Sequence, residues 1–209
     1  MIPAEGQRDL IVLVADLDMK AMIDAALKRT PALGIREVSH FVAQHLYRDS
    51  GVLQGAHDFL QSQSRNYLHA LTVCDRQGCG REDLSREQLE TMIEGRLSNH
   101  WADRAAAVVI DPELENWVWA DSPHVARAIG WPDGMPALRT WLLNEGFLAE
   151  GQAKPADPKA ALLKALRSTR QRQSSALYQA VASTVSLRRC GDPAFLKLRA
   201  KLQSWFPAG

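Results

Sequence analysis

The chain has 209 residues, which is enough for one hydrophobic core or for a core with a small appended subdomain. Its composition, 46% hydrophobic and 23% charged with a net charge of +1, is typical of a soluble globular protein, and no stretch is long and apolar enough to span a bilayer. The first five residues lack the basic and apolar regions of a signal peptide, and three cysteines are an odd number for a disulfide framework, so we predict a cytosolic protein without disulfide bonds.

The first half of the chain alternates apolar runs with amphipathic segments. A helix is predicted after the first run, over residues 19–29, and Gly51 and Gly55 are predicted to bracket a loop and turn before a second helix. Ser85 and Gln88 have the spacing of a capping box that opens a third. This order predicts an α/β fold with a mainly parallel sheet flanked by helices. The predicted strands are residues 10–15, 37–42, 69–74 and 105–110.

The second half has the character of a helical C-terminal part. Four Asp-Pro or Ser-Pro pairs read as an N-cap followed by proline at the first helical position. We therefore predict an α/β domain over residues 1–121 and a helical extension over residues 122–209 that packs on it, with residues 151–155 as the best linker. The predicted helices begin near residues 112, 123, 136, 158, 174 and 193.

Charge is unevenly distributed along the chain. From residue 151 onward there are 11 Lys and Arg against 2 Asp and Glu, whereas the first 150 residues hold 14 basic and 22 acidic side chains. One interpretation is an acidic metal site beside a surface that binds a polyanion. The other is that solvated helix faces differ by chance, or that the two halves attract each other. The sequence favours neither.

Three apolar runs each end on an aspartate: Asp16, Asp75 and Asp111. In an open parallel sheet, ligands bind in the crevice outside the carboxyl ends of the strands. Carboxylates gathered there suit a divalent cation and phosphate chemistry. Asp18 lies two residues after Asp16 and extends the set, although an aspartate at this point is also a common helix N-cap.

The segment 111–121 is the most unusual in the chain. If it is helical, Asp111 is the N-cap, and Glu115 lies on the same face four residues later, toward the same crevice. The alternative is that these acids only complement the positive helix N-terminus, which explains Glu115 less well because apolar residues surround it. The predicted metal ligands are Asp16, Asp18, Asp75, Asp111 and Glu115.

Basic residues are the candidates for phosphate contacts. Arg48 follows the second predicted strand on the carboxyl edge, where it would hold a phosphate or pair with a site acid. The rest lie in the basic tail, where any single one is equally well explained as solvated surface. The predicted nucleic-acid contacts are Arg48, Lys154, Lys159, Arg170, Arg172, Arg188 and Arg189.

Residues 16–19, 75–80 and 111–121, with the later segments 154–159 and 192–198, resemble a bacterial family of Toprim-like proteins found in prokaryotic defence islands. The resemblance spans nearly the whole chain, and Glu-Leu-Glu-Asn-Trp at 113–117 is its most specific part. The closest likeness is to a component of a methylation-associated anti-phage defence system. The resemblance implies a Toprim-like sheet, a Mg²⁺ or Mn²⁺ site, phosphodiester chemistry on nucleic acid, and other defence-system proteins as partners.

The sequence departs from the Toprim pattern at two positions. Ala15 stands where that superfamily ends its first strand on a catalytic glutamate, and Gln77 stands where a second metal-binding aspartate is expected. In one hypothesis Asp16, Asp75 and Glu115 supply the catalytic groups of a metal-dependent nuclease. In the other the site is degenerate, and the protein is a non-catalytic sensor or adaptor.

A second family shares part of this pattern. An apolar strand followed by Asp16 and Asp18 is also similar to the haloacid dehalogenase-like phosphotransferases, in which the first aspartate is the nucleophile. Helix signals begin directly after Asp18 and leave no room for the flap of that family, so this resemblance is the weaker one.

Overall fold

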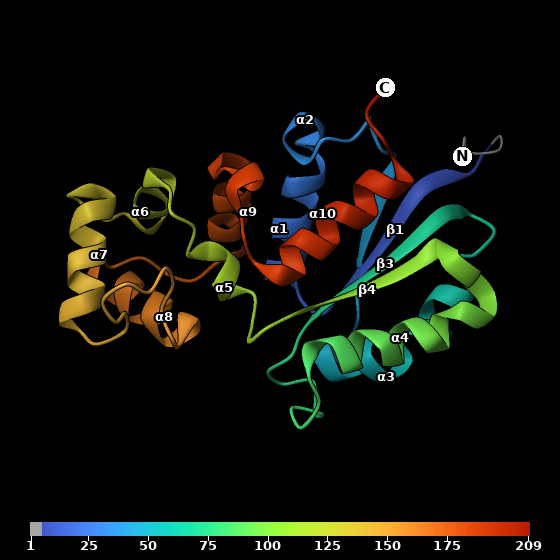
Figure 1. Cartoon of the computed structure of the whole chain (residues 1–209), viewed down its shortest axis with the longest axis horizontal. Coiled ribbons are helices and arrows are strands. Elements are labelled where there is room, and N and C mark those ends of the chain that lie inside the picture. Colours follow the sequence, from blue (N-terminus) through green and yellow to red (C-terminus); the bar gives the residue numbers. More distant parts are fainter. Residues whose placement is uncertain (1–5) are drawn as a thin grey trace.

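The computed structural model describes residues 6–209, and its centre is a parallel β-sheet (Figure 1). Within these residues the sheet has four strands in the order β2-β1-β3-β4, all parallel, as expected from the sequence. Val14 pairs with Gln44 and with Val73, and Asp75 pairs with Ile110, so the strands end at one common edge. The strands are β1 (Arg8–Val14), β2 (His40–Gln44), β3 (Tyr67–Asp75) and β4 (Ala105–Ile110).

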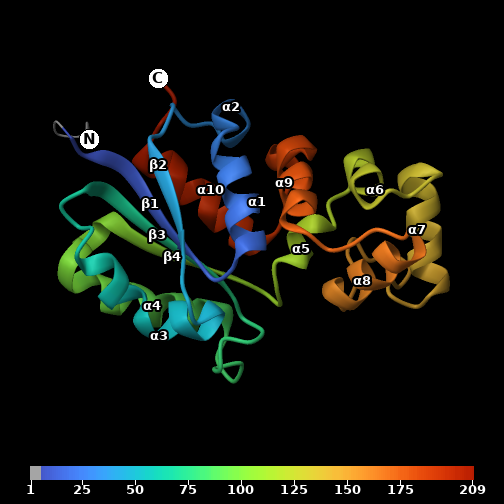
Figure 2. The same ribbon diagram turned by 180° about the vertical axis from the view of Figure 1, so that it is seen from behind.

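Helices cover both faces of the sheet (Figures 1 and 2). One face carries α1 (Leu17–Leu27), with the short α2 (Thr30–Leu33) beyond its end, and α10 (Pro193–Trp205). The opposite face carries α3 (Arg48–Gln61) and α4 (Arg86–Trp101). All nine residues of β3 are buried, as expected for a central parallel strand with helices on both sides.

The helices of residues 122–209 form two groups, one in a lobe beside the sheet and one packed back on the α/β part. After the short α5 (Glu115–Val118), a lobe beside the sheet holds α6 (Pro123–Ile129), α7 (Gly134–Asn144) and α8 (Pro158–Ser168) (Figure 1). The chain then returns, and α9 (Ser175–Thr184) packs on α1 while α10 packs on the sheet. Two single-turn 3₁₀ helices connect longer elements: η1 (Ala102–Arg104) lies between α4 and β4, and η2 (Leu187–Arg189) lies between α9 and α10. No helix among residues 6–209 has the length and apolar character needed to cross a membrane.

The turn predicted at Gly51 and Gly55 is wrong, because both glycines lie inside α3. The ring of His45 occupies the space beside them: a Cβ on Gly51 would lie 2.1 Å from His45 Nδ1, and a Cβ on Gly55 would lie 3.3 Å from Nε2. Gly51 is therefore required by a close approach of the preceding loop to the helix and not by a turn, whereas a side chain at Gly55 would meet the ring less closely.

The helix predicted to begin near residue 112 is also wrong. The Asp111-Pro112 peptide bond is cis, and α5 begins only at Glu115. The backbone carbonyls around the proline accept hydrogen bonds from the chain after β3 and not from a helix. The carbonyl of Ile110 accepts from the N–H of Arg76, and the carbonyl of Pro112 accepts from the N–H of Gln77. These bonds continue the pairing of β4 with the chain that leaves β3. The prolines predicted to open helices at 123, 158 and 193 do so.

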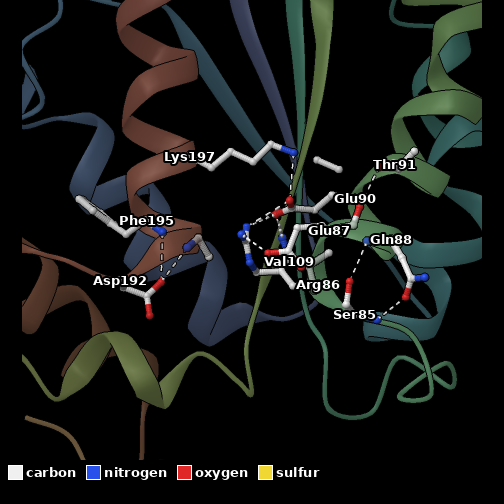
Figure 3. A network of polar contacts seen from close by, with 12 residues as sticks. Ser85, Arg86, Glu87, Gln88, Glu90, Thr91, Val109, Asp192, Phe195 and Lys197 are labelled. Atoms are coloured by element: carbon white, nitrogen blue, oxygen red, sulfur yellow. Dashed lines mark hydrogen bonds and ion pairs between the residues drawn. The ribbon is translucent and has the colours of Figure 1, made fainter.

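The outer edge of β4 is covered by side chains (Figure 3). Glu90 and Glu94 of α4 accept hydrogen bonds of 3.0 Å from the N–H groups of Val109 and Ala107, which point away from β3. Lys197 of α10 pairs with both glutamates, and Arg86 pairs with Glu90. The predicted capping box of Ser85 and Gln88 is present and fixes the start of this helix. An edge closed in this way does not accept another strand.

His69 is a buried histidine near the start of β3, away from the carboxyl edge of the sheet. Its ring stacks on Trp205 with centroids 4.6 Å apart and meets the edge of Phe206. Burial lowers the pKa of His69 to about 4, and Nδ1 has no hydrogen-bond partner within residues 6–209. The folded protein therefore holds this imidazole neutral.

We expect the substitution His69→Phe to make stability less sensitive to acid. A histidine whose pKa is lowered by folding contributes stability above pH 6.5, and the contribution is lost as the pH falls toward 4. At pH 4 this loss is about 3 kcal/mol at most in the native protein. Urea unfolding between pH 7 and pH 4.5 measures it, with the exposed His100→Gln as control. Equal pH dependence in the native protein and in the His69→Phe variant would contradict this account.

Candidate functional site at the carboxyl edge of the sheet

A cleft of about 670 Å³ lies at the edge where the strands end. Its walls come from the ends of β1 to β3, from α5 of the connecting segment, and from the first turns of α8 and α9. Carboxylates of three separate segments thus face one space, with two cationic side chains on its border. The residues from the sequence prediction that line it are Asp16, Asp18, Asp75, Glu115, Arg48 and Lys159.

Asp16 and Asp18 are positioned by the start of α1. Asp16 is the N-cap, and its Oδ1 accepts from the N–H of Met19 at 2.8 Å. Asp18 lies in the first turn and accepts from the hydroxyl of Ser175 at 2.6 Å. Ser175 begins α9, so a residue 157 positions later holds this carboxylate in place.

Asp75 is the last residue of β3 and is 9% exposed. Its backbone N–H donates to Oδ1 of Asp49 at 2.8 Å, and its own Oδ1 has no hydrogen-bond partner within residues 6–209. Burial, and then the charges of Asp49, Glu115 and Asp16, raise the pKa of Asp75 well above its usual range, although a backbone hydrogen bond from Leu114 opposes the shift. Burial also raises the pKa of Asp49. Burial and the neighbouring carboxyl groups thus disfavour the ionised form of Asp75 in the folded protein.

Glu115 is buried at the start of α5 and is held by the returning C-terminal chain. Its Oε1 accepts from the hydroxyl of Tyr178 at 2.7 Å and from Nε2 of Gln173 at 3.3 Å. Burial and the charge of Glu115 raise the pKa of Tyr178, so the phenol stays protonated and remains a donor. Glu115 is thus an oriented carboxylate that faces the cleft.

Lys159 and Arg48 are the two cations of the cleft. Lys159, in the first turn of α8, pairs with Glu113 at 2.9 Å. Although burial lowers the pKa of Lys159, the bond with Glu113 and the charge of Glu115 raise it above its usual value. Arg48 is exposed, and its guanidinium makes no hydrogen bond or ion pair to any of residues 6–209. It is available for an external anion.

Other predicted site residues lie elsewhere. Asp111 does not line the cleft: its side chain is 47% exposed and faces Arg76 at 3.5 Å. Lys154 and Arg189 line a different cleft, of about 700 Å³, beside Trp117 and Trp119. Arg188 donates to the carbonyl of Pro31. The remaining two, Arg170 and Arg172, are exposed in the loop that leads to Gln173.

Asp49, Gln173 and Tyr178 were missing from the predicted site. The rule that found Asp16 and Asp75 does not reach Asp49, which lies five residues after the end of β2, in the first turn of α3. Gln173 and Tyr178 carry no such signal either. Their place depends on the packing of α9 on α1, which brings residues about 60 positions apart to Glu115.

The donors of the cleft suit a hard divalent cation only in part. Among residues 6–209, no three His, Cys, Asp or Glu side chains converge closely enough to hold a metal ion by themselves. Mg²⁺ nevertheless keeps several waters and is commonly bound by one or two carboxylates together with substrate phosphates. The unpartnered Oδ1 of Asp75, with Asp16 on the same cleft, fits that mode.

The chain was compared with protein-family models, curated proteins and solved structures, and none of them matches it. The resemblance to Toprim-like defence proteins therefore stays a prediction. The parallel sheet flanked by helices is consistent with it.

We expect Asp75→Asn to stabilise the metal-free protein at neutral pH. Folding raises the pKa of Asp75, so the native protein is most stable, with respect to this group, below about pH 4, where the carboxyl is protonated in both states. This contribution is lost as the pH rises toward the pKa of Asp75 in the folded protein. Asparagine has no charge to bury, so the variant is more stable than the native protein at pH 7, and the difference disappears near pH 4.

Calorimetry in the presence of EDTA measures this gain. Asp111→Asn is the matched control, because Asp111 is exposed outside the cleft, and its effect stays within about 0.5 kcal/mol. A loss of stability in Asp75→Asn at pH 7 would show that the ionised carboxylate is stabilising in the folded protein.

Proposed function

We propose that this protein is a metal-dependent phosphodiesterase that acts on nucleic acid. The observation that carries the proposal is the buried Oδ1 of Asp75, which has no partner among residues 6–209 and lies among the carboxylates of a cleft. A divalent cation would satisfy this oxygen and offset the charge of its neighbours. A phosphate diester brings the anionic oxygens that complete the coordination of Mg²⁺.

Each lining residue has a role that its position supports. Asp75 and Asp16 would hold the Mg²⁺ or Mn²⁺, with Asp18 contributing through water. When bound, the cation polarises the phosphate and acidifies a water molecule. Glu115, oriented by Tyr178, would accept the proton of the attacking water. Arg48 would bind a phosphate oxygen at the border of the cleft.

Asp16 is the natural replacement for the strand-terminal glutamate of the Toprim pattern. Ala15 is fully buried, so a carboxylate at that position would lie in the core. Asp16 comes one residue later and lines the cleft. The exposed Gln77 has no counterpart of this kind, which leaves one position of the pattern unfilled.

Contacts with the nucleic acid outside the cleft would come from basic residues of the C-terminal part. Arg170 and Arg172 are exposed beside Gln173, which lines the cleft, and they would extend the contact along the backbone of the nucleic acid. Such contacts position a strand without reading its sequence. Lys154, Arg188 and Arg189 lie elsewhere and are weaker candidates.

The cellular role follows from the resemblance alone. It supports a cytosolic component of a prokaryotic anti-phage defence system that works with other proteins of that system. The alternative is a non-catalytic sensor or adaptor, and the observation that favours it is the lack of three convergent metal ligands among residues 6–209.

Hydrolysis assays test the proposal. We expect the protein to cleave DNA or RNA with Mg²⁺ or Mn²⁺, and Asp75→Asn and Glu115→Gln to lower the rate by at least about 100-fold, as expected for loss of a metal ligand or a general base. Asp111→Asn, outside the cleft, retains activity. Full activity in Asp75→Asn and Glu115→Gln would refute this assignment.

Calorimetric titration with Mg²⁺ separates the two candidate functions. The phosphodiesterase binds Mg²⁺ in a manner that Asp75→Asn abolishes. A protein that binds no Mg²⁺, cleaves no nucleic acid and is recovered from its host in a stable complex is the adaptor instead.

A further inference from the structure

Exposed apolar side chains lie at the carboxyl edge of the sheet, on or next in sequence to residues that line the cleft. Leu46 is 89% exposed and Tyr47 is 75% exposed, the highest values among the large apolar residues of the described chain. Leu17, which is 58% exposed, follows the end of β1 and lines the cleft. Leu46 and Tyr47 follow the end of β2, the neighbour of β1, so all three belong to the carboxyl edge of the sheet.

The loop that presents Tyr47 is fixed by its contacts with α3. The backbone N–H of Tyr47 donates to Nδ1 of His45, and the two rings lie 6.0 Å apart. A Cβ on Gly51 would lie 2.8 Å from Cβ of Tyr47, so only glycine allows this approach. Burial lowers the pKa of His45, which keeps the imidazole neutral and able to accept. The tyrosine ring is therefore exposed on a fixed support.

Arg48 follows Tyr47 directly and lies at the border of the cleft. Its backbone φ is +50°, in the left-handed region that residues other than glycine rarely adopt. Such a conformation costs free energy, and residues with strained backbones cluster at functional sites. Its guanidinium lines the cleft without a partner among residues 6–209. An exposed aromatic ring and an unpaired guanidinium thus stand on consecutive residues, and the second of these residues lines the cleft.

We propose that this border binds an unpaired nucleic-acid strand, with a base stacked on Tyr47 and the adjoining phosphate on Arg48. The inference rests on the proposed function and gives it a substrate class, single-stranded rather than duplex. Aromatic side chains bind unpaired bases through their faces without regard to sequence, whereas a duplex buries these faces in its own stack. The strand would then pass from Arg48 into the acidic cleft.

Fluorescence anisotropy with labelled oligothymidylate, in Ca²⁺ to limit turnover, tests the proposal. We expect Tyr47→Ala to weaken binding about tenfold or more, and Tyr47→Phe to bind within about twofold of the native protein, because stacking needs the ring and not the hydroxyl. The duplex of the same sequence binds more weakly than the single strand. Leu196→Ala removes another exposed apolar side chain, on α10, and leaves binding unchanged.

Equal affinity of Tyr47→Ala and native protein, or preference for the duplex, overturns the inference. So does sedimentation in which the native protein self-associates and Tyr47→Ala does not, since the border would then be a contact between copies. The proposed function is judged separately, by hydrolysis of bis(p-nitrophenyl) phosphate, a diester with no base to stack. Failure there with intact strand binding refutes the phosphodiesterase and not the strand-binding border.

Discussion

The burial of the Asp75 carboxyl group is the constraint on which the site depends. This group ends a strand whose nine residues are all buried, and one of its oxygens has no partner among residues 6–209. The charges of Asp49, Glu115 and Asp16 lie close enough to raise its pKa further. A buried carboxyl must be protonated, paired or bound to a cation. In the proposed function, the Asp75 carboxylate is bound to a cation.

The fold creates this arrangement from distant parts of the chain. Parallel pairing places the ends of β1, β2 and β3 at one edge, and thereby Asp16, Asp49 and Asp75. The helical C-terminal part then closes the cleft: α9 packs on α1 and supplies Tyr178 to Glu115, and α8 supplies Lys159. The extension is thus part of the site and not only an appendage.

The sequence predicts the sheet well, because buried parallel strands are continuous apolar runs and acids at their ends must face the same edge. Asp16 and Asp75 reach the cleft for that reason. Asp111 also follows a strand but stays outside, because backbone bonds to residues 76 and 77 turn the chain away before α5. Local patterns cannot show such long-range pairing, nor that the ring of His45, and not a turn, requires Gly51.

A crystal of the protein soaked in Mn²⁺ tests the proposed metal site, because manganese replaces magnesium at oxygen ligands and its anomalous signal locates it. We expect a peak in the cleft within coordination distance, about 2.2 Å, of Oδ1 of Asp75, with Asp16 as a direct or water-mediated ligand. No peak in the cleft, or a peak only beside Asp111, would contradict it.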